Sequence, residues 1–234
     1  MTDARDTPFS AGVVVPAAGS GRRMGGVKKP FLELQGRPVL ERALGPFLSD
    51  PRTVAVVVAL AHEEAADPPQ WLADLDARIR IVEGGATRAE SVRRALSGLP
   101  DDVEVIAVHD GARPFVTAEV VRTCLDLAAT GVGAVAGTPA VDTMKRVGPD
   151  GAVLETPRRE TLWHAQTPQA FPADALRRAY RELVEPGTDD ATLVEATGLR
   201  IQMIDAGAGN FKVTRPADLA LGEALLAHLA VEGG

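Results

Sequence analysis

Residues 13–23 read Val13-Val14-Val15-Pro16-Ala17-Ala18-Gly19-Ser20-Gly21-Arg22-Arg23, a short β-branched run followed at once by a loop of small residues. Three consecutive valines are typical of a strand that is buried on both faces, as in a parallel sheet. Small residues after such a strand let backbone N–H groups come close to phosphate oxygens. Loops of this kind lie at the carboxyl end of an open α/β sheet, where ligands bind. The segment therefore predicts an α/β protein with an anion-binding loop.

The rest of the chain alternates between β-branched runs and amphipathic segments. We expect strands over 54–60, 79–82, 103–108 and 134–136, with helices over 39–48, 88–96 and 118–129. Right-handed crossovers place such helices on both faces of a mostly parallel sheet, which predicts a three-layer, Rossmann-like fold. Further helices are expected over 173–184, 189–196 and 216–226, and short strands over 200–204 and 211–213. Without internal repeats or a linker, residues 11–230 form one predicted domain after a disordered tail over residues 1–10.

One region interrupts this alternation. Residues 139–166 are polar and lack a sustained helical or strand period. A long irregular insertion in a compact domain is usually functional or serves as an interaction arm. We therefore predict a protruding arm there, with a plain surface loop as the alternative.

Composition narrows the functional class. The net charge of −7 argues against broad nucleic-acid binding, which favours basic surfaces. No apolar run approaches the ~20 residues that span a membrane, and the polar start of the chain does not resemble a signal peptide. Cys124 has no second cysteine with which to pair, so a reducing cytoplasm is the expected compartment. We expect Cys124 itself to be a buried helix residue.

Positive charge gathers beside the glycine-rich loop. Between residues 10 and 32 there is no acidic residue, yet Arg22, Arg23, Lys28 and Lys29 are present. Cations beside a glycine-rich turn suit a triphosphate whose charge grows during phosphoryl transfer. The Gly-Lys-Ser/Thr of an NTPase phosphate loop is missing, and the glycine spacing is one residue too long for a dinucleotide fingerprint. A solvated basic loop is the remaining alternative.

This loop resembles the signature loop of the 2-C-methyl-D-erythritol 4-phosphate cytidylyltransferases. Further segments match that family in chain order: Gly84-Gly85-x-x-Arg88-x-x-Ser91-Val92, Val108-His109-Asp110-Gly111-Ala112-Arg113-Pro114, Asp142-Thr143-Met144-Lys145-Arg146, Leu162-Trp163-His164-Ala165-Gln166-Thr167-Pro168-Gln169, Thr188-Asp189-Asp190-Ala191 and Asn210-Phe211-Lys212-Val213-Thr214-Arg215-Pro216. Together they span nearly the whole chain. Gly111 and Asp190 stand where the family more usually has Ala and Glu, changes too small to alter the chemistry.

The resemblance implies a nucleotide-diphospho-sugar transferase fold and a homodimer in which 139–166 is the dimerisation arm. It also implies a Mg²⁺-dependent transfer of the cytidylyl group of CTP to 2-C-methyl-D-erythritol 4-phosphate. The products would be 4-diphosphocytidyl-2-C-methyl-D-erythritol and pyrophosphate, in non-mevalonate isoprenoid biosynthesis. The alternatives are a ribitol-5-phosphate or other polyol-phosphate cytidylyltransferase and a non-catalytic nucleotide sensor. The sensor is disfavoured because Arg23, Lys29 and Lys212 are all present.

Matching positions also imply catalytic roles. Arg23 and Lys29 would hold the triphosphate and stabilise the transition state, with Lys28 as the substitute if the loop shifts by one residue. Arg159 and Lys212 would aim the phosphate of the second substrate.

The remaining matched positions are implied to bind the two substrates. The CTP-binding set is Ala17, Ala18, Gly19, Gly85, Arg88, Ser91, Asp110 and Gly111, and the second-substrate set is Arg113, Thr143, Thr167 and Thr188. Asp110 is also the candidate Mg²⁺ ligand, with a cap or a sugar contact as its alternative role. Because Thr143 and Arg159 lie in the arm, the family implies that they reach the active site of the other subunit.

Overall fold

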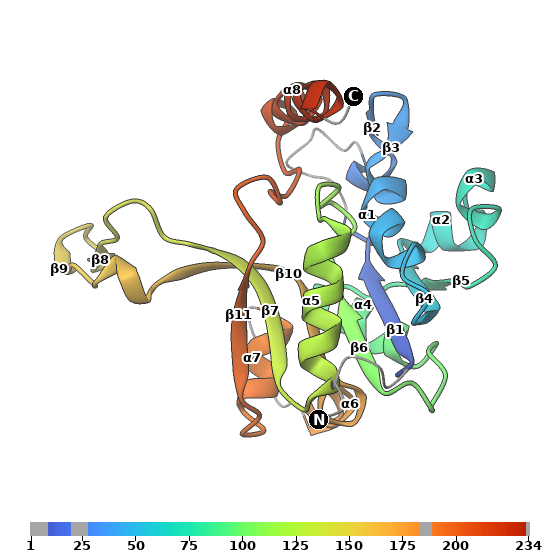
Figure 1. Ribbon diagram of the computed structural model, residues 1–234, viewed down its shortest axis with the longest axis horizontal. Coiled ribbons are helices and arrows are strands. Elements are labelled where there is room, and N and C mark those ends of the chain that lie inside the picture. The colour runs from blue at the N-terminus through green and yellow to red at the C-terminus, as the bar shows by residue number, and fades with distance from the viewer. Residues whose placement is uncertain (1–8, 20–27, 183–188, 233–234) are drawn as a thin grey trace.

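The chain was analysed as a computed structural model that describes residues 9–19, 28–182 and 189–232. A seven-stranded sheet forms its centre, in the order β11-β7-β10-β6-β1-β4-β5 (Figure 1). Within this sheet β10 runs antiparallel to its neighbours β6 and β7, and the other pairings are parallel. The strands are β1 (Ala11–Pro16), β4 (Thr53–Leu60), β5 (Ile79–Glu83), β6 (Val105–Val108), β7 (Gly133–Pro139), β10 (Trp163–Pro172) and β11 (Ile201–Asp205).

Helices cover both faces of the sheet, as the sequence predicts. Alternate strand residues point to opposite faces, so Val13 and Val15 join one buried cluster while Val14 joins the other. The first cluster includes side chains of α1 (Val39–Leu48) and α5 (Ala118–Ala129), and Cys124 is buried within it. The second includes side chains of α4 (Arg88–Leu96), α6 (Ala173–Glu182) and α7 (Asp190–Glu195). The result is the predicted three-layer α/β fold.

Caps fix where several of these helices begin. The Thr87 hydroxyl accepts the Glu90 N–H at the start of α4, and Thr117 does the same for Val120 at the start of α5. The predicted ranges of α1, α4 and α5 agree with the observed ones. The closing helix α8 (Pro216–Glu232) extends past the predicted end at residue 226. The smaller elements are β2 (Glu33–Leu34), β3 (Arg37–Pro38), α2 (His62–Ala66), α3 (Gln70–Ala73) and the 3₁₀ turns η2 (Lys29–Phe31) and η3 (Arg159–Thr161).

The arm leaves the sheet between two neighbouring strands. β7 runs outward and β10 returns beside it, with Trp163 paired to Pro139, and the hairpin of β8 (Arg146–Val147) and β9 (Val153–Glu155) lies at the tip (Figure 1). The sequence prediction that 139–166 lacks strand structure is wrong here, because β10 begins at Trp163. Trp163, the first residue of β10, is 37% exposed and does not belong to the core.

Two other segments refine the sequence prediction. The prediction of a strand over 211–213 is wrong, because these residues have no regular secondary structure and the Val213 N–H donates to the Ala112 carbonyl. At the other end of the chain, Phe9 packs against the first cluster. The Ser10 carbonyl accepts the N–H groups of Glu104 and Val105 at the start of β6. Residues 1–8 of the expected tail lie outside the described residues. Within the described part of the chain, no helix has both the length and the apolar character needed to cross a bilayer.

Candidate functional site

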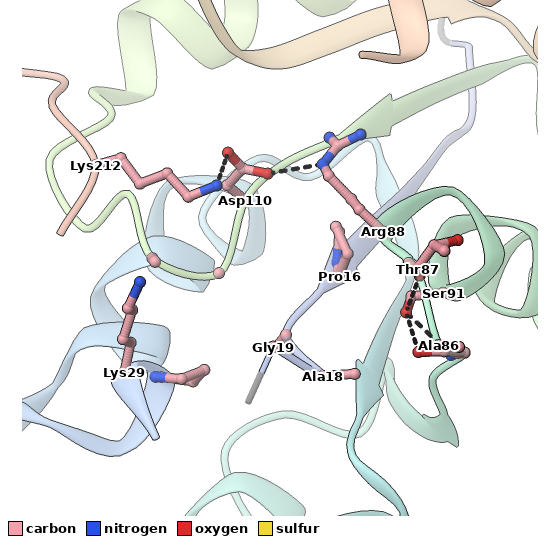
Figure 2. A pocket seen from close by; sticks show the side chains of 15 residues that line it. Pro16, Ala18, Gly19, Lys29, Ala86, Thr87, Arg88, Ser91, Asp110 and Lys212 are labelled. Atoms are coloured by element: carbon pink, nitrogen blue, oxygen red, sulfur yellow. Dashed lines mark hydrogen bonds and ion pairs between the residues drawn. The ribbon is translucent and has the colours of Figure 1, made fainter. Parts of the chain in front are cut away.

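A cavity of about 620 Å³ opens at the carboxyl ends of β1, β5 and β6. This is the edge at which ligands of open α/β sheets bind. Three loops and one turn meet there, and Figure 2 shows how their side chains lie. The lining residues are Pro16, Ala17, Ala18, Gly19, Lys29, Pro30, Gly85, Ala86, Thr87, Arg88, Ser91, Asp110, Gly111, Ala112 and Lys212.

The loop after β1 forms one wall, and it is held against the loop after β5. The Ala17 N–H donates to the Ala59 carbonyl at 2.8 Å, which extends the strand pairing into the loop. A Cβ atom on Gly84 would lie 2.5 Å from the Cβ of Ala18, so only glycine permits this contact. Arg22 and Arg23, the cations predicted to follow, lie outside the described residues.

Ser91 supports the part of the wall that is formed by the loop after β5. Its side chain is buried, its oxygen accepts the Gly85 N–H at 3.0 Å, and its hydroxyl donates to the Thr87 carbonyl at 2.9 Å. Ser91 lines the cavity as predicted, but its hydroxyl is engaged by the backbone of the loop. Its contribution is therefore to hold the backbone of Gly85 and Thr87 in place at the cavity wall.

Asp110, which follows β6, is surrounded by cations. Its carboxylate accepts Lys212 Nζ at 2.8 Å and Arg88 Nε at 3.1 Å, and it lies 3.5 Å from Arg113 Nε (Figure 2 shows the first two). Burial of the carboxylate raises its pKa, but attraction to Lys212 and Arg88 outweighs that effect. The net result is a pKa well below the ordinary value. Asp110 is therefore ionised at neutral pH, and it holds Lys212 and Arg88 at the cavity and Arg113 behind its wall.

His109 and Thr167 support Asp110 from below. The Thr167 hydroxyl accepts the Asp110 N–H at 3.0 Å and lies 3.1 Å from His109 Nδ1, while His109 Nε2 lies 3.1 Å from the Arg113 carbonyl. A neutral imidazole with its proton on Nε2 satisfies all three contacts. Burial lowers the pKa of His109 to about 4, so this neutral form persists at physiological pH.

The two adjacent lysines occupy different environments. Lys29, in η2, lines the cavity. Lys28 forms ion pairs with Glu63 and Glu64 of α2. Of the two alternatives that the sequence left open, Lys29 is the one that lines the cavity.

The residues expected to bind the second substrate are distributed differently. Arg113 donates to the Asn210 carbonyl at 3.0 Å and Thr167 is buried, so both lie behind the cavity wall rather than on it. Thr143 and Arg159 are exposed on the arm, where Arg159 Nη1 donates to the Val141 carbonyl at 2.8 Å. Thr188 lies outside the described residues. The cavity of one chain thus brings together the predicted CTP-binding set with Lys29 and Lys212.

Asp110 is the acidic residue available to a metal ion at this cavity. Among the described residues, no cluster of three or more His, Cys, Asp or Glu side chains is placed to hold a metal. Asp110 is, within that same part of the chain, the sole carboxylate that lines the cavity. One carboxylate suits Mg²⁺ shared with a bound nucleotide, because this ion keeps several waters and takes further oxygens from substrate phosphates.

Three residues at or behind the cavity were not predicted from the sequence. Thr87 lines the cavity beside Arg88, and the buried residues Asp190 and Tyr180 lie behind Arg88. The cap pattern Thr87-x-x-Glu90 and the Thr-Asp-Asp-Ala motif were the available signals. Neither signal shows that these residues meet in space.

Comparisons with known proteins agree on one family. A sequence model of the 2-C-methyl-D-erythritol 4-phosphate cytidylyltransferases matches residues 11–228. The enzyme of that name from Symbiobacterium thermophilum is 44% identical over 218 residues, which cover 92% of each chain. The crystal structure of the enzyme of that name from Thermus thermophilus has a TM-score of 0.76 at 35% identity, covering 94% of this chain and 98% of that one. A 4-diphosphocytidyl-2C-methyl-D-erythritol synthase from Anaerococcus prevotii has a TM-score of 0.84 at 26% identity, covering 94% and 97%.

Proposed function

Because the chain belongs to the 2-C-methyl-D-erythritol 4-phosphate cytidylyltransferase family, we propose that its cavity binds CTP and that Arg23, Lys29, Arg159 and Lys212 carry out the reaction. The chain is a nucleotidyltransferase. It transfers the cytidylyl group of CTP to 2-C-methyl-D-erythritol 4-phosphate, and it acts in isoprenoid biosynthesis. The observation that carries the proposal is the meeting of small-residue loops with Lys29, Lys212 and Arg88 around one cavity.

The orientation of CTP follows from where charge lies in the cavity. Lys29 and Lys212 lie on one side, and Ala86 and Ser91 on the other (Figure 2). We place the triphosphate beside the lysines and Gly19, where ammonium groups balance its charge. We place the cytosine toward Ala18, Gly85 and Ser91, which line the part of the cavity away from the lysines.

Catalysis in this arrangement needs cations rather than a base. The phosphate of the second substrate is already an anionic nucleophile at neutral pH. Attack at the α-phosphorus forms the new P–O bond, and the bond to the pyrophosphate oxygen breaks. Arg23 and Lys29 stabilise the charge that develops on the α- and β-phosphates, and preorganised donors of this kind each contribute about 3–4 kcal/mol. Lys212 and Arg159 bring the two anions together and orient them.

In this scheme a Mg²⁺ ion would bind beside Asp110. Asp110 would supply one carboxylate ligand, with phosphate oxygens and water completing the coordination. The ion would neutralise part of the triphosphate charge. Lys212 and Arg88, which pair with Asp110 in the unliganded chain, would then be free to contact phosphate.

The second substrate site is completed by another copy of the chain. Thr143 and Arg159 are exposed on the arm, away from the cavity of their own chain. The arm also exposes several large apolar side chains, a pattern that marks an interaction surface: Val141, Met144, Val147, Val153, Leu154 and Trp163. We propose a homodimer in which these apolar groups become buried and Thr143 and Arg159 reach the partner's cavity. Thr188, which lies outside the described residues, is assigned to the second substrate by family match alone, and Arg113 and Thr167 support Asp110 from behind.

Mixed dimers test this sharing of residues. An Arg23→Ala chain and an Arg159→Ala chain are each expected to lose most activity as homodimers. Co-expressed with two different tags and purified through both, they form heterodimers in which one active site has both wild-type residues. Turnover of about half the wild-type value is expected. If doubly tagged dimers form but remain as inactive as either parent, the proposed sharing is wrong.

The proposed setting is the cytoplasm, with two small phosphorylated substrates as partners and neither nucleic acid nor membrane involved. A buried lone thiol and an acidic net charge support this setting.

The function is tested by measuring pyrophosphate release with CTP, Mg²⁺ and 2-C-methyl-D-erythritol 4-phosphate. Replacing the sugar phosphate by ribitol 5-phosphate, or CTP by ATP, is expected to lower kcat/KM at least ~100-fold, since buried polar contacts left unpaired cost this much or more.

A further inference from the structure

A chain of buried polar groups runs from the helical layer to the cavity. Tyr180 of α6 donates its hydroxyl proton to Asp190 Oδ1 at 2.5 Å, and Asp190 Oδ2 accepts Arg88 Nη2 at 2.7 Å. Arg88 Nε then donates to Asp110 Oδ1 at 3.1 Å. The Arg88 guanidinium is thus shared between two carboxylates, one inside the protein and one at the cavity.

Asp190 and Tyr180 belong to the interior rather than to the cavity wall. Asp190 is 0% exposed and Tyr180 is 7% exposed, and neither lines the cavity. A buried carboxylate is expensive unless it is paired and hydrogen-bonded, and here both of its oxygens have a partner. Any effect of these two residues on a ligand must therefore pass through Arg88.

The position of Asp190 is fixed by the scaffold. Asp190 begins α7, and the next residue, Ala191, donates its N–H to Gln169 Oε1 of β10 at 2.9 Å. Asp189 caps the same helix and accepts Gln169 Nε2 at 2.9 Å. These contacts attach the start of α7 to the central sheet. A carboxylate held in this way can fix a long, flexible arginine side chain in one orientation.

We propose that Asp190, oriented by Tyr180, is a positioning residue that holds the Arg88 guanidinium at the cavity in the arrangement that binds CTP. Without the second carboxylate, Asp110 is the one hydrogen-bond partner that Arg88 keeps among the described residues, and the guanidinium is free to leave the cavity wall or to neutralise Asp110 more fully. Either change removes a preorganised cation from the nucleotide site. This inference rests on the proposed placement of CTP in the cavity.

The first experiment compares two near-isosteric substitutions of buried, arginine-paired aspartates. Asp190→Asn removes the charge that holds Arg88. Asp50→Asn is the control, because Asp50 is also buried and pairs with Arg52 at 2.7 Å, away from the cavity. For Asp190→Asn we expect KM for CTP to rise about tenfold, the effect of losing one hydrogen bond to a charged group. We expect kcat to stay within about threefold, because the residues proposed to carry out the reaction, Arg23, Lys29, Arg159 and Lys212, are unchanged. Asp50→Asn should leave both values near wild type while lowering Tm.

A second set of variants separates positioning from general destabilisation. In an Arg88→Ala background, Asp190→Asn should produce no further rise in KM for CTP, since the two residues act in series. Tyr180→Phe removes the hydroxyl that orients Asp190 and keeps both charges of the Asp190–Arg88 pair, so it provides a test even if Asp190→Asn fails to fold. It should raise KM for CTP about threefold.

Direct measurement of CTP binding by calorimetry distinguishes a failure of the positioning role from a failure of the proposed function. If the wild-type protein does not bind CTP, the proposed function is wrong. If wild-type protein and the Asp50 variant bind CTP and Asp190→Asn or Tyr180→Phe binds it equally well, the positioning role is overturned. Additive effects of Asp190→Asn and Arg88→Ala on KM would overturn it as well.

Discussion

Lys28 and Lys29 carry the same charge on neighbouring residues, yet only one of them faces the cavity. Lys28 pairs with two glutamates of α2, and Lys29 lines the cavity. Lys29→Ala is therefore expected to lower kcat about 100- to 1000-fold, the usual cost of removing one preorganised donor. Lys28→Ala should cost less than about tenfold, through looser positioning of the turn that carries Lys29. Steady-state pyrophosphate release measures both, and a larger loss for Lys28→Ala would reverse the assignment.

His109 links stability to pH. Burial lowers its pKa to about 4 in the folded protein, while an unfolded histidine has a pKa near ~6.5. The unfolded chain therefore binds a proton first as pH falls, so this contribution to stability is complete above pH ~6.5 and is lost between pH ~6.5 and about 4. The loss amounts to about 2–3 kcal/mol at pH ~4.5.

Urea unfolding at pH ~7.5 and ~4.5 measures this loss, and a His109→Gln variant isolates it. The variant should lose about 2–3 kcal/mol less than wild type between the two pH values. Asp110 does not interfere, because its lowered pKa makes its own contribution fall only below pH ~4. Equal pH dependence in the two proteins would contradict the buried neutral form.

At the scale of single elements, the cap of α4 has two roles. Thr87 accepts the Glu90 N–H and also lines the cavity, whereas Thr117 caps α5 in the same way without lining it. Thr87→Ala and Thr117→Ala should each cost about 1 kcal/mol of unfolding free energy. Only Thr87→Ala should also weaken CTP binding, because Arg88 and the loop before it lose their anchor. Denaturation and calorimetry test both effects, and equal CTP affinity for the two variants would count against the second role of Thr87.

Elements with a strong local signal were predictable from sequence. The helices 39–48, 88–96 and 118–129 have an apolar stripe along their whole length, and two of them begin at a threonine cap. Strand β10 has no such signal, since its centre reads Gln166-Thr167-Pro168-Gln169. It becomes a strand because it is inserted between β6 and β7, which come earlier in the sequence, and this pairing cannot be read from local periodicity.

The same distinction applies to the site. All eight residues assigned to CTP from the sequence line the cavity, because they lie in short motifs at the ends of strands. The support behind Arg88 was not predicted. Arg88 and Asp190 are 102 residues apart in sequence, as are Asp110 and Lys212. Such contacts depend on how the helical layers are stacked.

For the whole molecule, we expect the arm to be needed for the proposed dimer but not for folding of the sheet. Its two ends enter neighbouring strands at the paired residues Pro139 and Trp163. A short hairpin turn in place of residues 140–162 should therefore leave the sheet intact and Tm within a few degrees of wild type. The truncated protein should be monomeric and at least ~100-fold less active, since Thr143 and Arg159 are lost. Sedimentation and pyrophosphate release measure these outcomes, and a truncated protein that remains dimeric would show that the interface lies elsewhere.

The pairing of Pro139 with Trp163 also affects how such a protein can evolve. In the proposed dimer, insertions, deletions and substitutions between those two residues would change the surface that meets the partner without shifting the register of the sheet. Two gene copies in one cell could therefore diverge in which subunit each one dimerises with, while their nucleotide pockets stay the same. Arms exchanged between distant homologues should transfer the dimerisation preference with them.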